Sequence, residues 1–253
     1  MKTSKRSSKS NMKQKWIVAG ILTAVTVGVL ILGWFSLPRN GAGDTAHSTV
    51  VTPSVEETPI ETPNGIIDLG SGLKLEKLAF ACGNFPEDGS DDFLPAILSA
   101  TFVNEGEKTL QYAKVAVVAD GKRYTFEFST LPPGKSVCAF EMNRATPPDS
   151  IDSVSALVEL ISFFDTTPDV MKDKITITVE DGAISVKNIS SENLEGELSI
   201  FFKNKLGSSY MGGITYRVRI GGLAAGQTVS GYSSHAYKDS SEIMFVQFVD
   251  ANG

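Results

Sequence analysis

The chain has 253 residues, of which 42% are hydrophobic, so it can form one or two packed domains and is not disordered throughout. The net charge of −6 hides an asymmetry, because the first 37 residues carry six bases and no acid, while the rest carries 17 bases against 29 acids. The acidic part of the chain after residue 37 repels nucleic acid and anionic lipid headgroups, and we expect neither as its partner.

The segment Trp16–Leu37 is predicted to cross a membrane. It contains no charged residue, and as a helix rising about 1.5 Å per residue it spans about 33 Å, enough for a hydrocarbon core of about 30 Å. Since the basic tail 1–15 precedes it, we expect the N-terminus in the cytoplasm and the rest outside the cell membrane. A cleaved signal peptide is the alternative, although its apolar run is usually about 7–15 residues.

Residues 38–70 are predicted to form a disordered stalk. They are rich in Thr and Pro, as in Thr52-Pro53, Thr58-Pro59 and Thr62-Pro63. Proline disrupts helices and strand ladders, and a Pro-rich spacer is semi-rigid. We therefore expect this segment to hold the rest of the chain away from the bilayer.

From Ser71 onwards the pattern predicts an all-β structure. Short runs alternate apolar and polar residues, and Asp-Gly or Gly-Gly pairs separate them, which is typical of antiparallel sheets with one buried face. The predicted strands are 73–81, 96–104, 111–119, 123–129, 136–142 and 155–164, then 174–180, 183–188, 195–203, 215–220, 228–232 and 242–249. A helix is the alternative only around residues 153–164. The two series predict one module over residues 71–168 and another over 172–253.

The two series repeat one pattern. Four pairs of landmarks recur at spacings of 84 or 92 residues: Asn104 and Asn188, Leu110 and Leu194, Leu131 and Leu223, and Gly134 and Gly226. The change in spacing requires an insertion of eight residues, and the glycine-rich segment Leu206–Ile214 at a hairpin tip is the obvious place. This favours a duplicated module with one longer loop, because loops absorb length changes at little cost.

The repeated unit resembles the FxLyD-type and CARDB-like immunoglobulin-like β-sandwich modules found on bacterial surface proteins. The matching positions are Asn104, Leu110, Asp120, Gly121, Leu131 and Gly134 in the first copy, and Asn188, Leu194, Leu223 and Gly226 in the second, where Asn204 replaces the Asp. The resemblance implies two tandem immunoglobulin-like β-sandwich modules for adhesion, assembly or spacing outside the cytoplasm. The family has no general catalytic site, so no reaction is implied.

The hairpin tip Ser208–Gly213 is the predicted binding site. It combines an aromatic residue and a methionine, Tyr210 and Met211, which suit protein contacts. Three more tyrosines would extend the surface: Tyr216, Tyr232 and Tyr237. The alternative is an ordinary long hairpin whose tyrosine packs on its own module.

Cys82 and Cys138 are the only cysteines, and both fall in the first predicted module. An even number outside the cytoplasm is compatible with a disulfide, and a bridge closing this loop would stabilise the fold by about 4 kcal/mol. Two separate buried thiols are the alternative.

A metal site is not expected. Asp88, Asp91 and Asp92 are weak Ca²⁺ candidates in the acidic segment 87–92, but their spacing does not fit an EF-hand, and a solvated acidic loop is favoured. Because His47 and His235 are the only histidines, a His-based metal site or a Ser-His-Asp triad is not expected either.

The sequence therefore predicts a single-pass membrane protein, without a cofactor and without enzymatic activity, whose β modules bind a protein or a cell-wall component. An accessory subunit of a membrane-embedded envelope assembly is the main alternative. Small residues at Gly20, Ala24 and Gly28 would allow the membrane helix to pack closely against another helix. An extracytoplasmic enzyme of unrecognised type is the weaker alternative.

Overall fold

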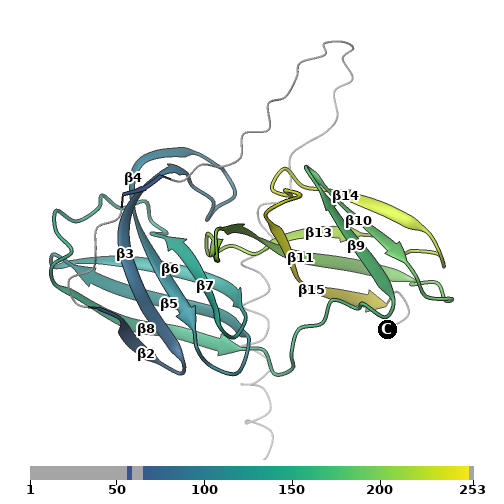
Figure 1. Cartoon of the computed structure of the whole chain (residues 1–253), viewed down its shortest axis with the longest axis horizontal. Helices are drawn as coiled ribbons and strands as arrows, with labels where there is room; N and C mark the ends of the chain where they lie inside the picture. Colours follow the sequence, from purple (N-terminus) through teal and green to yellow (C-terminus); the bar gives the residue numbers. More distant parts are fainter. Residues whose placement is uncertain (1–55, 59–64, 251–253) are drawn as a thin grey trace, which may run out of the picture. The chain divides into compact units, whose positions relative to one another are not determined.

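The computed structural model describes residues 56–58 and 65–250, and these residues form strands and turns without a helix (Figure 1). The all-β prediction is confirmed for this part of the chain. The predicted basic tail 1–15, the membrane segment Trp16–Leu37 and most of the stalk lie outside the described residues. No helix able to cross a membrane is found among the residues described.

Each predicted strand is present, with ends that differ by a few residues, and the segment for which a helix was the alternative forms a strand, Val154–Phe163. The first series is β3 (Leu73–Asn84), β4 (Phe93–Asn104), β5 (Leu110–Ala119), β6 (Lys122–Leu131), β7 (Lys135–Phe140) and β8 (Val154–Phe163). The second is β9 (Ile175–Glu180), β10 (Ala183–Asn188), β11 (Gly196–Leu206), β13 (Tyr216–Ile220), β14 (Thr228–Tyr232) and β15 (Ser241–Asp250). β12 (Ser209–Met211) is additional.

Two short strands lie inside the segment predicted as a disordered stalk. β1 (Glu56–Thr58) and β2 (Ile67–Gly70) both pair antiparallel with β3. Ile67 and Leu69 of β2 are partly buried against the hydrophobic core. The stalk prediction is wrong at this end, because two apolar side chains at alternate positions provide a face that an adjacent sheet edge can bury.

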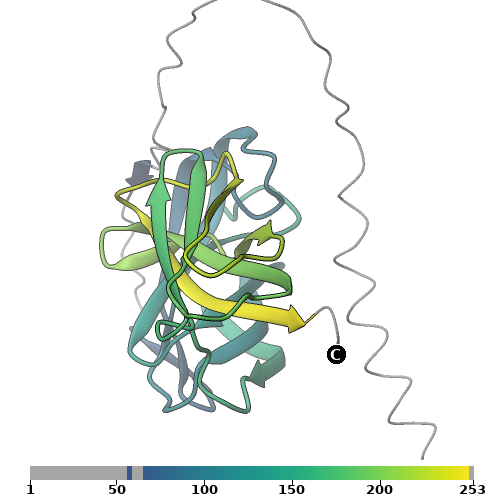
Figure 2. The same ribbon diagram turned by 90° about the vertical axis from the view of Figure 1, so that its right-hand side faces the viewer.

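Two modules share one strand order. In the first, β3-β4-β7 form one sheet layer and β6-β5-β8 the other; in the second, β9-β10-β14 and β13-β11-β15 take the same places. Each pair of layers encloses its own apolar core, an arrangement consistent with a β-sandwich. Figure 2 shows the second module from the side, with β15 in yellow. The matching order indicates that the repeat seen in the sequence is a repeat of structure.

The cores are built from the inward residues of the alternating strands. In the first module Phe102 stacks on Phe128, with ring centroids 4.7 Å apart, and meets the edge of Phe126 at 5.8 Å. In the second, Phe202 stacks on Tyr216 at 5.4 Å. Burying one such side chain stabilises the fold by about 1.5–3 kcal/mol, so these positions explain why the alternating pattern specifies the sheets.

One buried asparagine organises the same corner in both modules. Asn104 Nδ2 donates to the carbonyls of Lys108 (2.9 Å) and Leu131 (2.8 Å), and its Oδ1 accepts from Gly106 N at 3.0 Å. Asn188 Nδ2 donates to the carbonyls of Glu192 (2.7 Å) and Leu223 (3.1 Å), and its Oδ1 accepts from Ser190 N at 2.9 Å. The hydrogen-bond partners of Asn104 and those of Asn188 occupy equivalent positions, 84 or 92 residues apart in the sequence. The duplication therefore extends to individual hydrogen bonds.

Replacing either asparagine by alanine is expected to cost about 2–3 kcal/mol of unfolding free energy, because one buried carbonyl, one partly buried carbonyl and one amide each lose a hydrogen bond. We expect similar losses for Asn104→Ala and Asn188→Ala in urea unfolding. Asn193→Ala is the control, since Asn193 is exposed and accepts a single bond from Ala225 N, and it should cost much less. If both variants lose no more unfolding free energy than the control, the hydrogen bonds of these asparagines do not stabilise the modules.

The predicted insertion Leu206–Ile214 contains β12, which joins the two modules. β12 pairs antiparallel with β11 of its own module and parallel with β7 of the first, with Tyr210 opposite Val137 and Met211 opposite Cys138. Within the described residues this creates a nine-stranded sheet that runs through both modules. The eight added residues therefore serve as a docking strand.

Candidate functional site

The candidate site begins with an acidic loop after β3, residues 85–92. The loop is closed by a bond from Phe85 N to Asp92 O at 2.9 Å. Arg144 lies over the ring of Phe85, 4.6 Å from its centroid, and pairs with Asp88 and with Asp92. These contacts fold the loop back on the first module and direct Glu87 away from water.

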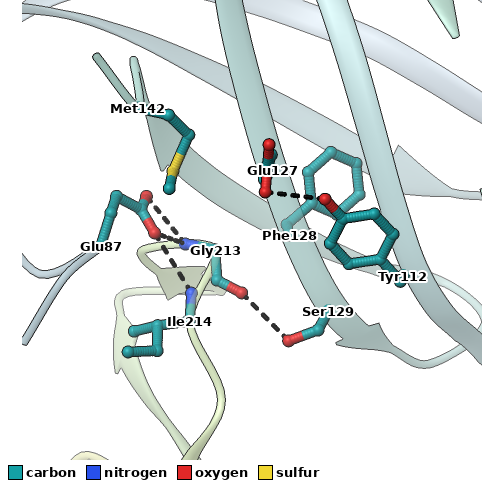
Figure 3. Close-up of a pocket in the computed structure, with 8 residues that line it drawn as sticks. All are labelled: Glu87, Tyr112, Glu127, Phe128, Ser129, Met142, Gly213 and Ile214. Atoms are coloured by element: carbon teal, nitrogen blue, oxygen red, sulfur yellow. Dashed lines mark hydrogen bonds between the residues drawn. The ribbon is translucent and has the colours of Figure 1, made fainter. Parts of the chain in front are cut away.

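Glu87 is only 7% exposed, and its carboxylate binds backbone N–H groups from both modules. Figure 3 shows the bonds from Gly213 and Ile214 of the second module. It accepts from Phe140 N at 2.7 Å in the first module. It also accepts from Gly213 N, at 2.9 and 2.7 Å to its two oxygens, and from Ile214 N at 3.2 Å in the second. A carboxylate that receives several N–H donors is well suited to holding two backbone segments together.

Lys203 of β11 holds the same segment from its carbonyl side. Its side chain is fully buried, and Nζ donates to the carbonyl oxygens of Gly213 (2.9 Å) and Ile214 (2.7 Å). Glu87 thus binds the N–H groups of this dipeptide and Lys203 binds its carbonyls. We call these four residues the Glu87–Lys203 clamp.

Burial shifts the proton affinity of both charged members. Desolvation raises the pKa of Glu87 from 4.5 to about 7, while the bonds from Phe140, Gly213 and Ile214 and the charge of Lys203 act in the opposite direction. Desolvation lowers the pKa of Lys203 from 10.5 to about 7, opposed by the charge of Glu87. Charge is therefore held in the clamp at a free-energy cost.

The stability that the clamp contributes is expected to be lowest near pH 7. Between pH 4.5 and about 7 the folded chain keeps a proton on Glu87 that the unfolded chain has lost, so stability falls as the pH rises. Between about 7 and 10.5 the unfolded chain keeps a proton on Lys203 that the folded chain has lost, so stability rises with pH.

The difference in unfolding free energy between the native chain and the Glu87→Gln/Lys203→Met variant tests this expectation. It should grow in favour of the native chain by about 1 kcal/mol per pH unit on either side of neutrality. A difference that is flat from about pH 5 to about pH 9 would contradict it.

A cavity of about 150 Å³ adjoins the clamp. Its lining residues are Glu87, Tyr112, Glu127, Phe128, Ser129, Met142, Gly213 and Ile214 (Figure 3). Tyr112 donates from its hydroxyl to Glu127 at 2.7 Å, and Lys114 Nζ lies 3.3 Å from the same carboxylate. Burial and this carboxylate raise the pKa of Tyr112. The polar groups here bind one another.

The predicted binding tyrosines do not form one surface. Tyr210 and Met211 are 2% and 5% exposed, because the hairpin tip that carries them is docked on the first module. Tyr216 is buried between Phe202 and His235, whereas Tyr237 is half-buried. Only Tyr232, 83% exposed, is freely accessible. The tip does make contacts, but within its own chain, so the prediction of an exposed binding tip needs correcting.

Cys82 and Cys138 are not joined by a disulfide. Cys82 lies on β3 and Cys138 on β7, and β4 runs between them. Two strand spacings of about 4.8 Å each already exceed the Cα separation of about 7 Å that a disulfide can bridge. The alternative of two separate thiols describes this structure.

The predicted Ca²⁺ candidates have other partners. Asp88 and Asp92 pair with Arg144, and Asp91 Oδ2 lies 3.1 Å from His235 Nε2, a contact without hydrogen-bond alignment. Across the described residues, no group of three His, Cys, Asp or Glu side chains is arranged to hold a metal ion. The acidic loop is therefore engaged with protein groups and is less solvated than expected.

No protein-family model matches the chain, and the comparison with curated proteins also finds no match. Its function must be inferred from the residues and their geometry.

Proposed function

We propose that this chain is a membrane-anchored extracytoplasmic binding and structural protein. In this proposal Trp16–Leu37 is the anchor, and the two β modules are immunoglobulin-like sandwiches that contact a protein or a cell-wall component. No catalytic role is assigned to them.

The observation that carries the proposal is the Glu87–Lys203 clamp. Two modules joined only by a linker would move freely, and each binding event would then lose conformational freedom. The clamp and the β12–β7 pairing instead hold both modules in one arrangement. Buried charged groups are a weak source of stability, and their best-attested use is to specify one geometry. Fixed spacing between surfaces is what a binding or assembly protein requires.

Exposed apolar side chains on the first module offer a contact surface. Val118, Leu157 and Leu160 are 38%, 66% and 55% exposed on β5 and β8. Leu157 lies opposite Ala116 and Leu160 opposite Lys114, and both partners are an even number of residues from Val118 on β5. Val118, Leu157 and Leu160 therefore share the outer face of this sheet. Large apolar residues gathered on one face are typical of protein contact surfaces.

Photo-crosslinking from position 157 in intact cells tests the proposal, with exposed Glu107 of the same module as the control position. Crosslinks to an extracytoplasmic protein or to wall material, specific to position 157, are the expected result. Protease added outside the cells should also cleave the β modules. Modules that stay protected in intact cells would refute the proposed location. Crosslinks confined to the segment around Gly20, Ala24 and Gly28 would favour the accessory-subunit alternative.

A further inference from the structure

The second module has an open apolar groove between its two sheets. The groove has a volume of about 410 Å³ and lies where β9 faces β15. Its lining residues are Val170, Lys172, Ile175, Thr176, Ile177 and Ile243. Four of these six residues are aliphatic, and Lys172 brings the one charge.

The corresponding place in the first module is occupied by β2. Strand registers establish the correspondence, because Leu73 and Leu75 pair with Asn104 and Phe102 as Ile175 and Ile177 pair with Asn188 and Val186. β2 pairs with this part of β3, with Ile67 opposite Leu75 and Asp68 opposite Lys74. Within the described residues, the outer edge of β9 pairs with no strand.

The open edge leaves apolar side chains incompletely covered. Leu73 and Leu75 of β3 are 1% and 2% exposed under β2. Ile175 of β9 is equally buried, but Ile177 and Val179 are only half-buried. At the edge of an antiparallel sheet, the N–H and C=O groups of every second residue point outward. Ile177 of β9 holds the same register position as Leu75 of β3, which lies opposite β2, so the outward groups of Ile177 correspond to those of Leu75. The second module therefore has an apolar groove and, beside it, a strand edge that pairs with no other strand among residues 65–250.

The chain's own linker does not fill the groove. By the same correspondence residues 169–172 match β2, but Asp169 O accepts from Val246 N at 2.8 Å, which ties the start of this segment to β15. Met171 has a φ of 55°, and its carbonyl accepts from Ile175 N at 2.9 Å, so the linker meets β9 at its first residue. Within the described residues, the path of the linker thus leaves the edge of β9 open from Ile177 onwards.

We infer that this groove binds an extended peptide segment of a partner protein, added as an antiparallel strand to β9. Two apolar side chains at alternate positions would enter the groove, and Lys172 in its lining would attract a peptide that carries an acid. β2 supplies the template for the apolar pair, since Ile67 and Leu69 flank Asp68; the lysine opposite Asp68, Lys74, is replaced by Thr176 in the second module. Strand addition is a common mode of peptide recognition, in which backbone bonds give affinity and alternate pockets give selectivity. The inference rests on the proposed function in taking the partner to be a protein.

Fluorescence anisotropy of a labelled peptide with the sequence of residues 65–70, titrated with the full-length chain in detergent, tests the inference. Saturable binding with a Kd below about 1 mM is expected. A control peptide with Ser in place of both apolar residues at positions 67 and 69 should not bind. Failure of the native peptide to bind would overturn the inference and leave the crosslinking and topology results of the proposed function unaffected.

A charge exchange identifies the groove as the site. Lys172 is exposed, so Lys172→Glu should fold normally and weaken peptide binding about threefold to tenfold. A peptide with Lys in place of its Asp should bind this variant better than it binds the native chain. Lys122→Glu is the matched control, because it changes the same charge at an exposed position of β6 in the first module, and it should alter neither affinity.

Two outcomes would overturn the inference despite a binding signal. If the peptide binds Lys172→Glu and Ile177→Asp as tightly as the native chain, it binds elsewhere, for example to β3 of the first module in place of β2. Thr178→Asp, on the opposite face of the same strand, controls for the added charge. A chain that dimerises at micromolar concentration and dissociates on adding the peptide would show that a second copy, and no partner protein, occupies the groove.

Discussion

Glu87→Gln is expected to lower the unfolding free energy by about 3–5 kcal/mol. The variant removes the charge that favours the ammonium form of Lys203, so the buried side chain must either give up its proton or remain charged without a counter-charge. In addition, an amide replaces an acceptor that binds Phe140, Gly213 and Ile214. Breaking a buried pair from one side costs more than the pair itself contributes, because the remaining charge cannot reach water. Urea unfolding of the full-length chain measures the loss.

Two comparisons make this expectation specific. Glu107→Gln removes the same charge from an exposed position and should change stability by less than about 0.5 kcal/mol. Adding Lys203→Met to Glu87→Gln should restore much of the lost stability, since neither charge is then buried alone. A double variant that is as unstable as the sum of the two single variants would mean that Glu87 and Lys203 do not act together.

Gly213→Ala is expected to have an effect of similar size by displacing the docking hairpin. A Cβ at this position would lie 1.9 Å from the carbonyl oxygen of Glu127 and 3.0 Å from Cα of Phe128. Both are backbone atoms of β6, so no rotamer change relieves the clash. Overpacking usually costs about 1–3 kcal/mol, and more is expected here because the clash also separates Gly213 from Glu87 and Lys203.

Hydrogen exchange across β12 measures the displacement directly. Exchange at Tyr210 and Met211 should rise in Gly213→Ala, because their pairing with β7 is lost. Gly221→Ala is the matched control, since Gly221 has open space around its Cα and no positive φ. Equal effects of the two alanines would contradict the idea that close backbone approach at Gly213 is what permits docking.

Much of the fold could be predicted because it depends on local pattern. The alternation in Lys174–Val179 and the Asp-Gly turns at Gly121 and Gly182 place strands and hairpins, and the structure has them there. β2 was missed because the Pro and Thr content around it indicates a spacer, while Ile67 and Leu69 become a strand only when β3 is beside them. β12 was likewise anticipated as a longer tip but not as a strand.

The candidate site was largely beyond prediction. Glu87 stands among acids that indicate a solvated loop, and Lys203 ends a run of apolar strand residues, where an exposed position is the ordinary expectation. One signal was present: Lys203 and Asn204 directly follow Phe202 in an apolar run, and both are buried in the structure. The sequence near Lys203 does not identify its partner, because Glu87 lies more than a hundred residues away.

The sequence by itself determined the all-β class of the described residues, the positions of the strands, the duplication and the place of the insertion. These depend on side-chain periodicity and on turn residues, which act over a few positions. Only the tertiary structure decided that the insertion docks on β7, that Glu87 and Lys203 clamp it, and that the edge of β9 stays open. Such contacts join residues far apart in the chain, and burial and charge compensation exist only once the strands are packed.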